Sequence, residues 1–477
     1  MGLTVFNTLA KQVQEFRSIE SGVVRMYNCG PTVYSRPHIG NFRAFLFADT
    51  LRRWLEYRGF EVRQVMNITD VGHLTDDDHD EGEDKIEARA RREKLDPWQI
   101  SRDIAALFLK DIADLGVRPA LTYPRATDHI PEMLEIIEGL IAKGYAYQVG
   151  GNVYYDVAKF ERYGKLSGNK VAELDAGSRV DVREDKRHPA DFALWKSDPQ
   201  HIMKWATRFG PDGFPGWHIE CSAMARKHLG DRLDIHTGGE DNIFPHHECE
   251  IAQSEAFTGL PFATYWMHSR FLQVDGGKMS KRLGNVYSLD DVRAKGFEPR
   301  ALRFALIRGH YRQPLNFTWD ALKDAKSSLD NLDDLVARLR RASRGSDATS
   351  GDGGGGELLE RARKTFEEGM DDDLNISRAL PALSQLRSDV IEGRLGRATA
   401  GEALKFMGRV ESALGCIRLD EELLAADIDA LIDKRQAARK AKDFRESDRI
   451  RNELVAKGIA LEDTAKGVIW KRIDPPK

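Results

Sequence analysis

The chain has 477 residues, 31% of them charged and 41% hydrophobic, which is long enough for roughly two to four domains with at least one well-buried core. Lysine plus arginine (72) nearly balances aspartate plus glutamate (76), so the net charge of −4 argues against a globally basic nucleic-acid binder but allows a local basic face. The four cysteines are too irregularly spaced for a disulfide framework, which favours a reducing, cytoplasmic location. We expect no signal peptide, and no apolar run approaches the ~18 residues of a membrane span.

The first third of the chain alternates between strand and helix patterns. Residues 23–29 predict a strand, residues 42–55 carry apolar side chains at helical spacing, and residues 62–68 predict a second strand. Such strand–helix–strand units build parallel sheets that bind ligands at the carboxyl ends of their strands. Strand patterns resume at residues 232–236 and 265–274, so we expect an α/β fold with a Rossmann-like parallel sheet.

The rest of the chain has three further patterns. A mixed segment resembles an insertion, with a helix at 131–143 and a short strand at Asn152–Asp156. From residue 315 the pattern is helical, and its one Gly/Ser/Asp-rich interruption indicates a flexible loop. Two basic helices and a hairpin of Ile459–Leu461 with Val468–Trp470 are expected at the end. The predicted domains are a Rossmann-like domain at 1–314 with an insertion at about 115–205 and a glycine-hinged loop at about 275–285, a helical bundle at 315–425 with a flexible loop at 343–356, and a small α+β module at 426–477.

Candidate metal ligands gather in a short segment near residue 246. His246 and Glu250 are four residues apart, so a helix places them on one face. Two isolated cysteines, Cys29 and Cys221, could join them in a tetrahedral zinc site. A His–Glu pair at this spacing is by itself more often an ordinary helix surface. Cys249 could compete as a ligand, but a helix does not easily point both Cys249 and Glu250 at one ion, so we interpret it as a small buried or half-exposed thiol.

Two segments have the composition of phosphate-binding loops. The sequence His38-Ile39-Gly40-Asn41 lies where the first strand passes into its helix, and the N–H groups and dipole of that helix end attract phosphate. Gly40 lets a nucleotide approach closely, and His38 and Asn41 can donate hydrogen bonds to it. The sequence Lys278-Met279-Ser280-Lys281-Arg282 follows two glycines and suits capture of a leaving pyrophosphate. Taken singly, an exposed turn and a solvated basic loop explain these segments as well.

In this order, the two segments resemble the HIGH and KMSKS signatures of class I aminoacyl-tRNA synthetases. Cys29, the sequence GWHIEC at 216–221 and the sequence FPHH at 244–247 narrow the resemblance to cysteinyl-tRNA synthetases, over nearly the whole chain. The resemblance implies that ATP and L-cysteine form a cysteinyl-adenylate, from which cysteine passes to tRNA(Cys). It also implies one zinc ion, with the ligands Cys29, Cys221, His246 and Glu250. Zinc binds a thiolate strongly and an alcohol poorly, which would separate cysteine from serine without an editing domain.

The same resemblance assigns the remaining site residues. The phosphates of ATP, with Mg²⁺ expected, would be bound by His38, Asn41, Lys278 and Lys281, the rest of the nucleotide by Gly40, Gly239 and Asp241, and cysteine by Thr69 and Trp217. The chain departs from the signatures at Asn41 and Arg282, where the family has histidine and serine. Because His38 and both lysines are retained, we expect activity to survive. The acidic run at 76–84 is interpreted as a solvated loop without a metal.

Two other functions are alternatives to a synthetase, and the terminal module helps to distinguish the first of them. Its basic helices would recognise the tRNA anticodon by resemblance, although a charged amphipathic surface is a fair competing interpretation. A cysteine ligase that acts on an amino-sugar acceptor in mycothiol synthesis would share the zinc and nucleotide sites, but a small acceptor needs no anticodon-binding module. A non-catalytic RNA-binding paralogue would not need His38, Lys278 and Lys281. We therefore expect a cytoplasmic, monomeric synthetase with tRNA(Cys), L-cysteine and ATP as partners and no membrane association.

Overall fold

The computed structural model describes residues 2–76, 81–169, 185–279, 283–344, 354–419, 424–456, 459–464 and 467–472. The chain packs into two compact units, each described here by itself. The first comprises Met1–Leu329, Glu360–Gln385 and Ser412–Cys416, and the second comprises Asp330–Leu359, Leu386–Glu411 and Ile417–Lys477. These compact units do not test the domain boundaries expected at residues 314 and 425, which remain predictions.

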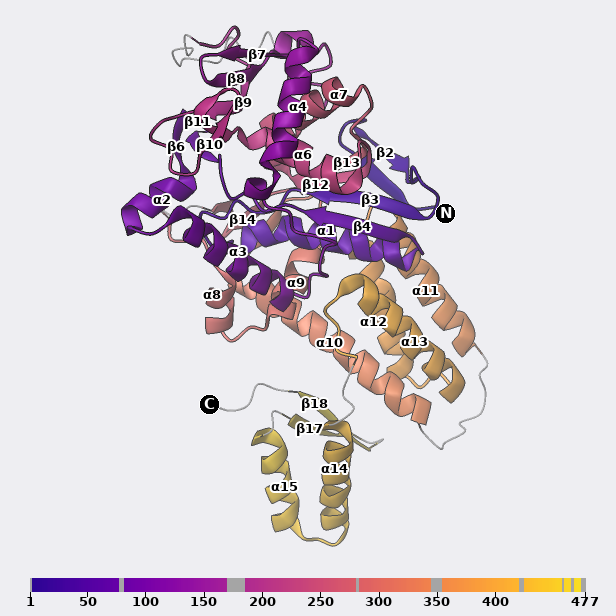
Figure 1. Cartoon of the computed structure of the whole chain (residues 1–477). Coiled ribbons are helices and arrows are strands. Elements are labelled where there is room, and N and C mark those ends of the chain that lie inside the picture. Colours follow the sequence, from indigo (N-terminus) through magenta and orange to yellow (C-terminus); the bar gives the residue numbers. More distant parts are fainter. Residues whose placement is uncertain are drawn as a thin grey trace. The chain divides into compact units, whose positions relative to one another are not determined.

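The centre of the first unit is a four-stranded sheet in the order β13-β12-β3-β4, and all its neighbours are parallel. Its strands are β3 (Val23–Asn28), β4 (Glu61–Met66), β12 (Leu233–Gly239) and β13 (Ala263–Ser269). Helices α1 (Ile39–Tyr57) and α6 (Trp217–Leu229) pack against it, on the two sides seen in Figure 1. The strand–helix–strand prediction and the Rossmann-like α/β class are confirmed.

A second sheet lies between β4 and β12 in the sequence. Its five strands are antiparallel, in the order β10-β11-β9-β8-β7. They are β7 (Ala146–Val149), β8 (Asn152–Tyr155), β9 (Phe192–Ser197), β10 (Trp205–Thr207) and β11 (Gly210–Pro215), and helix α4 (Ile130–Ala142) precedes them. The helix and strand expected at 131–143 and 152–156 are present as α4 and β8. Strand β11 carries the antiparallel sheet on to Pro215, directly before α6.

The acidic run at 76–84 is only partly described, because residues 77–80 lie outside the described part of the chain. Strand β5 (Leu74–Asp76) ends at the first residue of the run and pairs with strand β6 (Glu81–Asp84), which lies within it; helices α2 (Lys85–Glu93) and α3 (Pro97–Asp114) follow. Asp84 is 2% exposed, and its carboxylate caps α2 by accepting the N–H groups of Ile86 and Glu87. The expectation of a solvated loop is therefore wrong for Asp84, because a helix N-terminus stabilises a buried carboxylate.

Helix α2 is joined to the second sheet by a buried histidine. His201 is 4% exposed, and its Nδ1 lies 2.9 Å from Glu87 Oε1 while its Nε2 lies 3.8 Å from Asp84 Oδ2. Its ring stacks on Phe214 of β11 at 3.8 Å. Burial lowers the pKa of His201, but hydrogen bonds and charge from Asp84 and Glu87 outweigh it and raise the pKa to about 9.

The raised pKa predicts a pH-dependent contribution to stability. Because the folded-state value lies above the ordinary value near 6.5, the contribution is complete below about pH 6.5 and is lost as the pH rises through about 9. We expect His201→Gln to lower the free energy of unfolding by about 2–3 kcal/mol at pH 6 and by much less at pH 10. Urea denaturation of both proteins at the two pH values checks this, and an equal loss at both would contradict the ion pair.

The first unit also contains a small sheet and the helices that lead into the second unit. The sheet has the order β15-β14-β16, with β14 (Leu272–Val274), β15 (Gly277–Lys278) and β16 (Leu315–Phe317), and helices α8 (Leu289–Ala294) and α9 (Pro299–Ile307) lie between β15 and β16 in the chain. Residues 315–317 are thus a strand, because they pair with β14, and the predicted helical region begins at α10. The long helices are α10 (Trp319–Arg344), α11 (Gly355–Asp371), α12 (Ile376–Ile391) and α13 (Arg397–Leu414). Most of the loop predicted at 343–356 lies outside the described residues.

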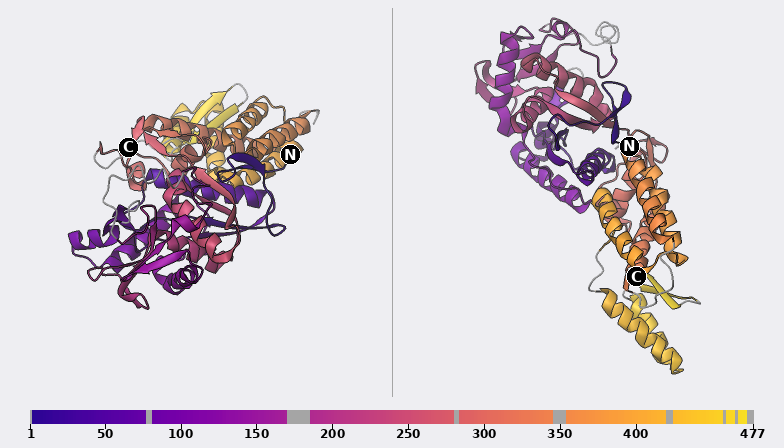
Figure 2. Two further views of the ribbon diagram at one scale, coloured as in Figure 1. Left: turned by 90° about the horizontal axis from the view of Figure 1, so that it is seen from above. Right: turned by 90° about the vertical axis from the view of Figure 1, so that its right-hand side faces the viewer.

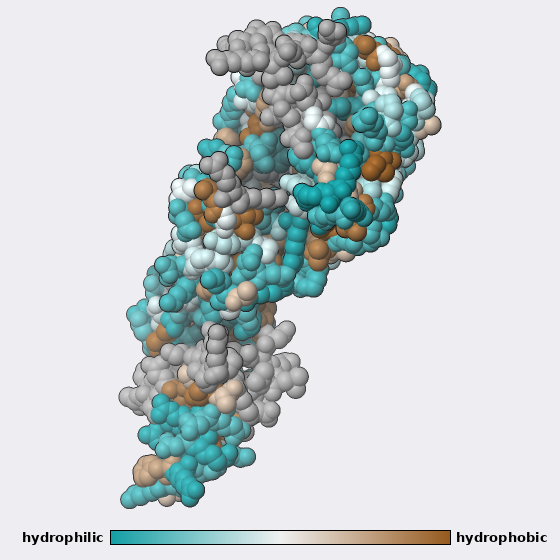
Figure 3. Space-filling view, turned by 90° about the vertical axis from the view of Figure 1, so that its left-hand side faces the viewer, coloured by the Kyte–Doolittle hydropathy of each residue, from teal (hydrophilic) through white to brown (hydrophobic). Residues whose placement is uncertain are grey.

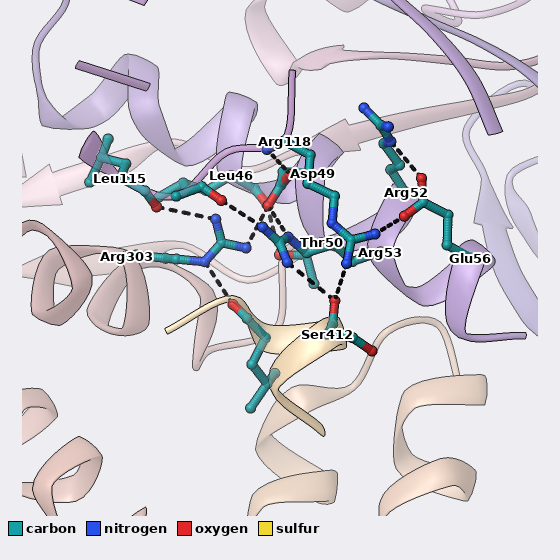
Figure 4. Close-up of polar contacts among 12 residues, drawn as sticks. Leu46, Asp49, Thr50, Arg52, Arg53, Glu56, Leu115, Arg118, Arg303 and Ser412 are labelled. Carbon is teal, nitrogen blue, oxygen red and sulfur yellow. Dashed lines mark hydrogen bonds and ion pairs between the residues drawn. The ribbon is translucent and has the colours of Figure 1, made fainter. Parts of the chain in front are cut away.

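Helix α1 carries a buried charged network, drawn in Figure 4. Oδ2 of Asp49 accepts hydrogen bonds from Arg53 at 2.7 Å and from Arg303 of α9 at 2.5 Å, and Oδ1 accepts the N–H of Arg118 at 2.8 Å. Arg303 is 0% exposed and donates a further hydrogen bond to the carbonyl oxygen of Leu414 at the end of α13. The Asp49 carboxylate therefore ties α1 to two distant segments of the first unit, and Arg303 extends the network to a third at Leu414.

The end of the second unit is a small module of two helices and a hairpin. Helices α14 (Leu424–Lys440) and α15 (Phe444–Ala456) lie side by side (Figure 2), and β17 (Ile459–Thr464) pairs with β18 (Gly467–Arg472). Ile432, Ile450 and Leu454 form its core with Ile459. The two helices and the hairpin predicted for this region are confirmed. Phe444, at the start of α15, is 63% exposed.

One face of the molecule is shown in Figure 3, where hydrophobic side chains are scattered among hydrophilic ones. Among the described residues, no helix is both long and apolar enough to span a bilayer.

Candidate functional site

The candidate site lies at the carboxyl end of the parallel sheet, where ligands of such folds bind. Cys29 directly follows β3, and Gly238 and Gly239 end β12. The chain then forms the short turns η4 (Glu240–Asn242) and η5 (Ile243–His247) before helix α7 (Glu248–Thr258). Helix α6, which begins at Trp217, packs against α7. Three segments that are separate in the sequence therefore deliver side chains to one place.

The four predicted metal ligands meet there. One donor atom from each of Cys29, Cys221, His246 and Glu250 lies within 4.8 Å of the others. Glu250 Oε1 is 3.2 Å from His246 Nε2 and 3.7 Å from Cys29 Sγ. Cys221, His246 and Glu250 are buried, and Cys29 is half-buried. The cluster is thus largely shielded from solvent, and Cys29 is the most exposed of its four residues.

Two further histidines, which the sequence analysis missed, adjoin the cluster. His236 on β12 lies 2.8 Å from Glu250 Oε2, and Nε2 of His247 lies 3.1 Å from Cys29 Sγ. These two histidines with Cys29 and Glu250 form a second group of donors within 4.8 Å. The strand expected at 232–236 placed His236 at the carboxyl end of the sheet, which was the available signal. His247 follows His246 directly, but only the fold shows that both side chains point inward.

A metal ion bound at the cluster would displace the protons of the two thiols. Burial raises the pKa of the Cys29 thiol well above its ordinary value, and Cys221 and Glu250 act in the same direction. Burial also raises the pKa of Cys221 and lowers that of His246 well below its ordinary value. Without a cation the thiols are therefore neutral near pH 7, whereas a metal ion deprotonates a coordinating thiol. Two sulfurs, an imidazole and a carboxylate are donors that zinc accepts, so the residues fit this ion.

The residues predicted to bind the amino acid lie beside the cluster. The indole of Trp217 is 4.3 Å from the His246 ring between centroids. Thr69 is 2% exposed, and its hydroxyl accepts a hydrogen bond from the Asn67 amide at 3.1 Å. The Oδ1 atom of Asn67 accepts a hydrogen bond from the N–H of Gly30, the residue after Cys29, at 2.8 Å. Trp217 thus adjoins a candidate ligand directly, and Thr69 is connected to Cys29 through Asn67.

The two phosphate-binding segments also lie together. His38 is the N-cap of α1, and a Cβ atom added to Gly40 would lie 2.1 Å from Met279 Cε, so the start of α1 touches the loop after β15. Lys278, the last residue of β15, is exposed just before that loop. Asn41 Oδ1 accepts the His38 N–H at 3.1 Å, so its oxygen caps the helix and its amide nitrogen is the remaining donor. Lys281 and Arg282 lie outside the described residues.

The predicted nucleotide contacts after β12 form a tight turn. The Gly239 N–H donates to Asn242 Oδ1 at 3.0 Å, and a Cβ atom on Gly239 would lie 2.2 Å from Asp241 Oδ1. Asp241 is exposed. Gly239 and the Asp241 carboxylate are thus close neighbours, and a contact of either with ribose stays a prediction. Cys249 belongs to neither donor group: it is fully buried, with the Tyr163 hydroxyl 3.4 Å from its sulfur.

Comparisons with known proteins agree with this geometry. The family described as tRNA synthetases class I (C) catalytic domain matches residues 15–327, and the family described as Cysteinyl-tRNA ligase anticodon binding domain matches residues 421–470. A cysteine–tRNA ligase of Thermus thermophilus is 45% identical over 99% of each chain, and that of Chlorobaculum tepidum is 41% identical over 98% of this chain and 99% of its own. A structure of Mycobacterium tuberculosis methionyl-tRNA synthetase with methionyl-adenylate matches 82% of this chain and 92% of its own with a TM-score of 0.62; at 14% identity it shows the fold alone.

Proposed function

The chain belongs to the cysteine–tRNA ligase family, and from that premise we propose that a zinc ion held by Cys29, Cys221, His246 and Glu250 selects its amino acid. The enzyme is an aminoacyl-tRNA synthetase that attaches L-cysteine to tRNA(Cys) in an ATP-dependent reaction. The observation that carries the proposal is the gathering of four donors from three distant segments within 4.8 Å.

The choice between the two donor groups follows from ligand softness. The group with Cys221 and His246 offers two thiolates, whereas the group with His236 and His247 offers one. Soft thiolate ligands favour zinc, so the group with two sulfurs suits this ion better than the group with one. Bound there, zinc would ligate the substrate's thiolate in preference to the hydroxyl of serine. The half-buried face beside Cys29 is the side from which that sulfur enters.

We propose that the remaining site residues bind ATP and the amino acid. The N-terminus of α1, with His38, Gly40 and Asn41, attracts the phosphates. Lys278 and Lys281 would stabilise the charge of the leaving pyrophosphate while the cysteinyl-adenylate forms. Gly239 and Asp241 would contact the nucleoside, and Thr69 and Trp217 would line the amino-acid pocket. Since the chemistry is mainly positioning and electrostatics, the retained lysines matter more than the change to Asn41.

Lys278 provides a direct test of the phosphate assignment. We expect Lys278→Ala to lower kcat for cysteine-dependent ATP–pyrophosphate exchange by about tenfold, less than the hundredfold or more of a buried donor, because Lys278 is exposed. The KM for cysteine should stay within about twofold, since the lysine does not touch the amino acid. Lys295→Ala, beyond the loop, is the control. An unchanged kcat in Lys278→Ala would contradict its role.

Charging of tRNA(Cys) with labelled cysteine, with serine as the competing amino acid, tests the proposed selectivity. We expect charging with cysteine alone. Pyrophosphate exchange without tRNA charging would instead indicate the amino-sugar ligase, which the match to an anticodon-binding domain at residues 421–470 disfavours. Dependence on Mg²⁺, a monomeric state and a cytoplasmic location complete the proposal; light scattering of the purified protein tests the monomer.

A further inference from the structure

The indole of Trp217 packs against two imidazole rings. The ring of His246, a proposed zinc ligand, is 4.3 Å away between centroids, at an angle of 32°. The ring of His73 stacks almost parallel to the indole, at 4.4 Å and 10°. Trp217 and His73 are both half-buried, whereas His246 is 1% exposed. The stack therefore runs from the buried metal cluster outward to the accessible side of the pocket.

Both ring nitrogens of His73 are held. Nε2 lies 2.6 Å from Lys85 Nζ, and because an ammonium group has no lone pair, Lys85 is the donor. Nδ1 is then the protonated nitrogen, and it donates to the Thr32 hydroxyl at 2.6 Å. Thr32 in turn pairs with Thr69, another residue of the predicted cysteine pocket, through an isolated bridge. The ring orientation of His73 is thereby fixed from two sides.

The backbone around His73 is fixed as well. The Lys85 N–H donates to the His73 carbonyl oxygen at 2.9 Å, and the Gly72 N–H donates to the Asp84 carboxylate at 2.8 Å. Gly72 has φ +76°, and a Cβ atom there would lie 2.6 Å from the Pro215 carbonyl oxygen, so the turn fits closely against the chain that leads into α6. Contacts with the start of α2 thus hold the backbone of His73 in the position from which its ring stacks on Trp217.

We propose that His73, held by Lys85, is a positioning residue that fixes Trp217 as the wall of the cysteine pocket. The inference deepens the proposed function and rests on its placement of the pocket beside His246. A stacked aromatic pair contributes beyond simple burial, and a tryptophan held by a stacked ring has fewer side-chain conformations to lose when the substrate binds. His73 contributes to binding of the amino acid through Trp217, and Lys85 contributes through His73.

Steady-state kinetics of pyrophosphate exchange test this. We expect His73→Ala to raise the KM for cysteine by about five- to tenfold, with the KM for ATP and kcat within about twofold of wild type. His73→Phe keeps a flat ring without the hydrogen bonds and should return the KM to within about threefold. Arg92→Met, on the same helix with a side chain 72% exposed, is the matched control for Lys85→Met and should change nothing. An unchanged KM for cysteine in His73→Ala overturns the inference.

A double-mutant cycle separates positioning from direct contact. Lys85→Met alone should raise the KM for cysteine by about threefold, and the same change in the His73→Phe protein should have no further effect. A full effect of Lys85→Met in that background would mean that Lys85 touches substrate itself, which overturns the inference. Loss of zinc from His73→Ala would also overturn it, because His73 would then support the metal cluster. Zinc missing from the wild-type protein would contradict the metal site instead, while the KM comparison still decides the role of His73.

Discussion

Replacing Cys221 with serine is expected to remove zinc from the purified enzyme and to lower kcat/KM for cysteine activation by at least about a hundredfold. Cys221 is 1% exposed and one of two sulfurs in the four-donor cluster. Loss of a residue that merely supports a metal ligand costs about 10–100-fold, so loss of a ligand should cost more. A serine hydroxyl is a poor zinc ligand, because zinc affinity follows softness and ease of deprotonation. Elemental analysis and pyrophosphate exchange measure the two effects.

The chain offers a matched control for this change. Cys249 is 0% exposed, lies one residue before Glu250, and belongs to neither donor group. Cys249→Ser should therefore keep one zinc per chain and nearly normal activity, with at most a small loss of stability. Removal of the metal from the wild-type protein by a chelator should reproduce the Cys221→Ser defect, and added zinc should reverse it. Full zinc in Cys221→Ser, or none in Cys249→Ser, would contradict the ligand assignment.

Replacing Asp49 with asparagine is expected to lower the free energy of unfolding by about 3–5 kcal/mol, because it leaves two buried guanidinium groups without their carboxylate. Asp49 is 1% exposed and accepts hydrogen bonds from Arg53 and Arg303. The network holds α1, whose N-terminus carries His38, so activity should fall at temperatures where the variant begins to unfold. Urea denaturation followed by tryptophan fluorescence measures the loss.

The pH dependence distinguishes the ion pair from simple packing. Burial raises the pKa of Asp49, but the charges of Arg303 and Arg53 outweigh it and hold the pKa below its ordinary value. A depressed pKa stabilises the fold above the unfolded value of about 3.9, and this contribution is lost as the pH falls further through the folded value. The difference in the free energy of unfolding between wild type and Asp49→Asn should therefore be constant near neutral pH and become smaller below about pH 4. Glu61→Gln, which removes the exposed pair with Arg63, should cost at most about 1 kcal/mol at any pH.

The parallel sheet was predictable because its signals are local. The strand at Val23–Asn28 and the helix at Ile39–Tyr57 follow from hydrophobic spacing alone, since each buries one continuous set of side chains. The short strand at Leu315–Phe317 was missed because only its pairing with a distant strand makes it one. Asp84 was misinterpreted for a similar reason, since its burial depends on the helix that it caps.

Spacing and motifs together predicted the candidate site. The four-residue spacing indicated that His246 and Glu250 share one helix face, but Cys29 and Cys221 have no local pattern that joins them to this pair. The family resemblance turned the two cysteines from possible partners into implied ligands, and the fold brings all four residues together. His73 lies in no motif, and its role depends on stacking against Trp217, which is so distant in the sequence that no sequence period encodes the contact.

Zinc K-edge X-ray absorption of the purified enzyme, with and without L-cysteine, tests the central claim most directly. The predicted spectrum without substrate has two sulfur ligands at about 2.3 Å together with nitrogen and oxygen ligands. Cysteine should add a third sulfur at about the same distance, and serine should leave the spectrum unchanged. An enzyme that charges tRNA(Cys) without zinc, or whose sulfur count does not rise with cysteine, would contradict selection by the metal.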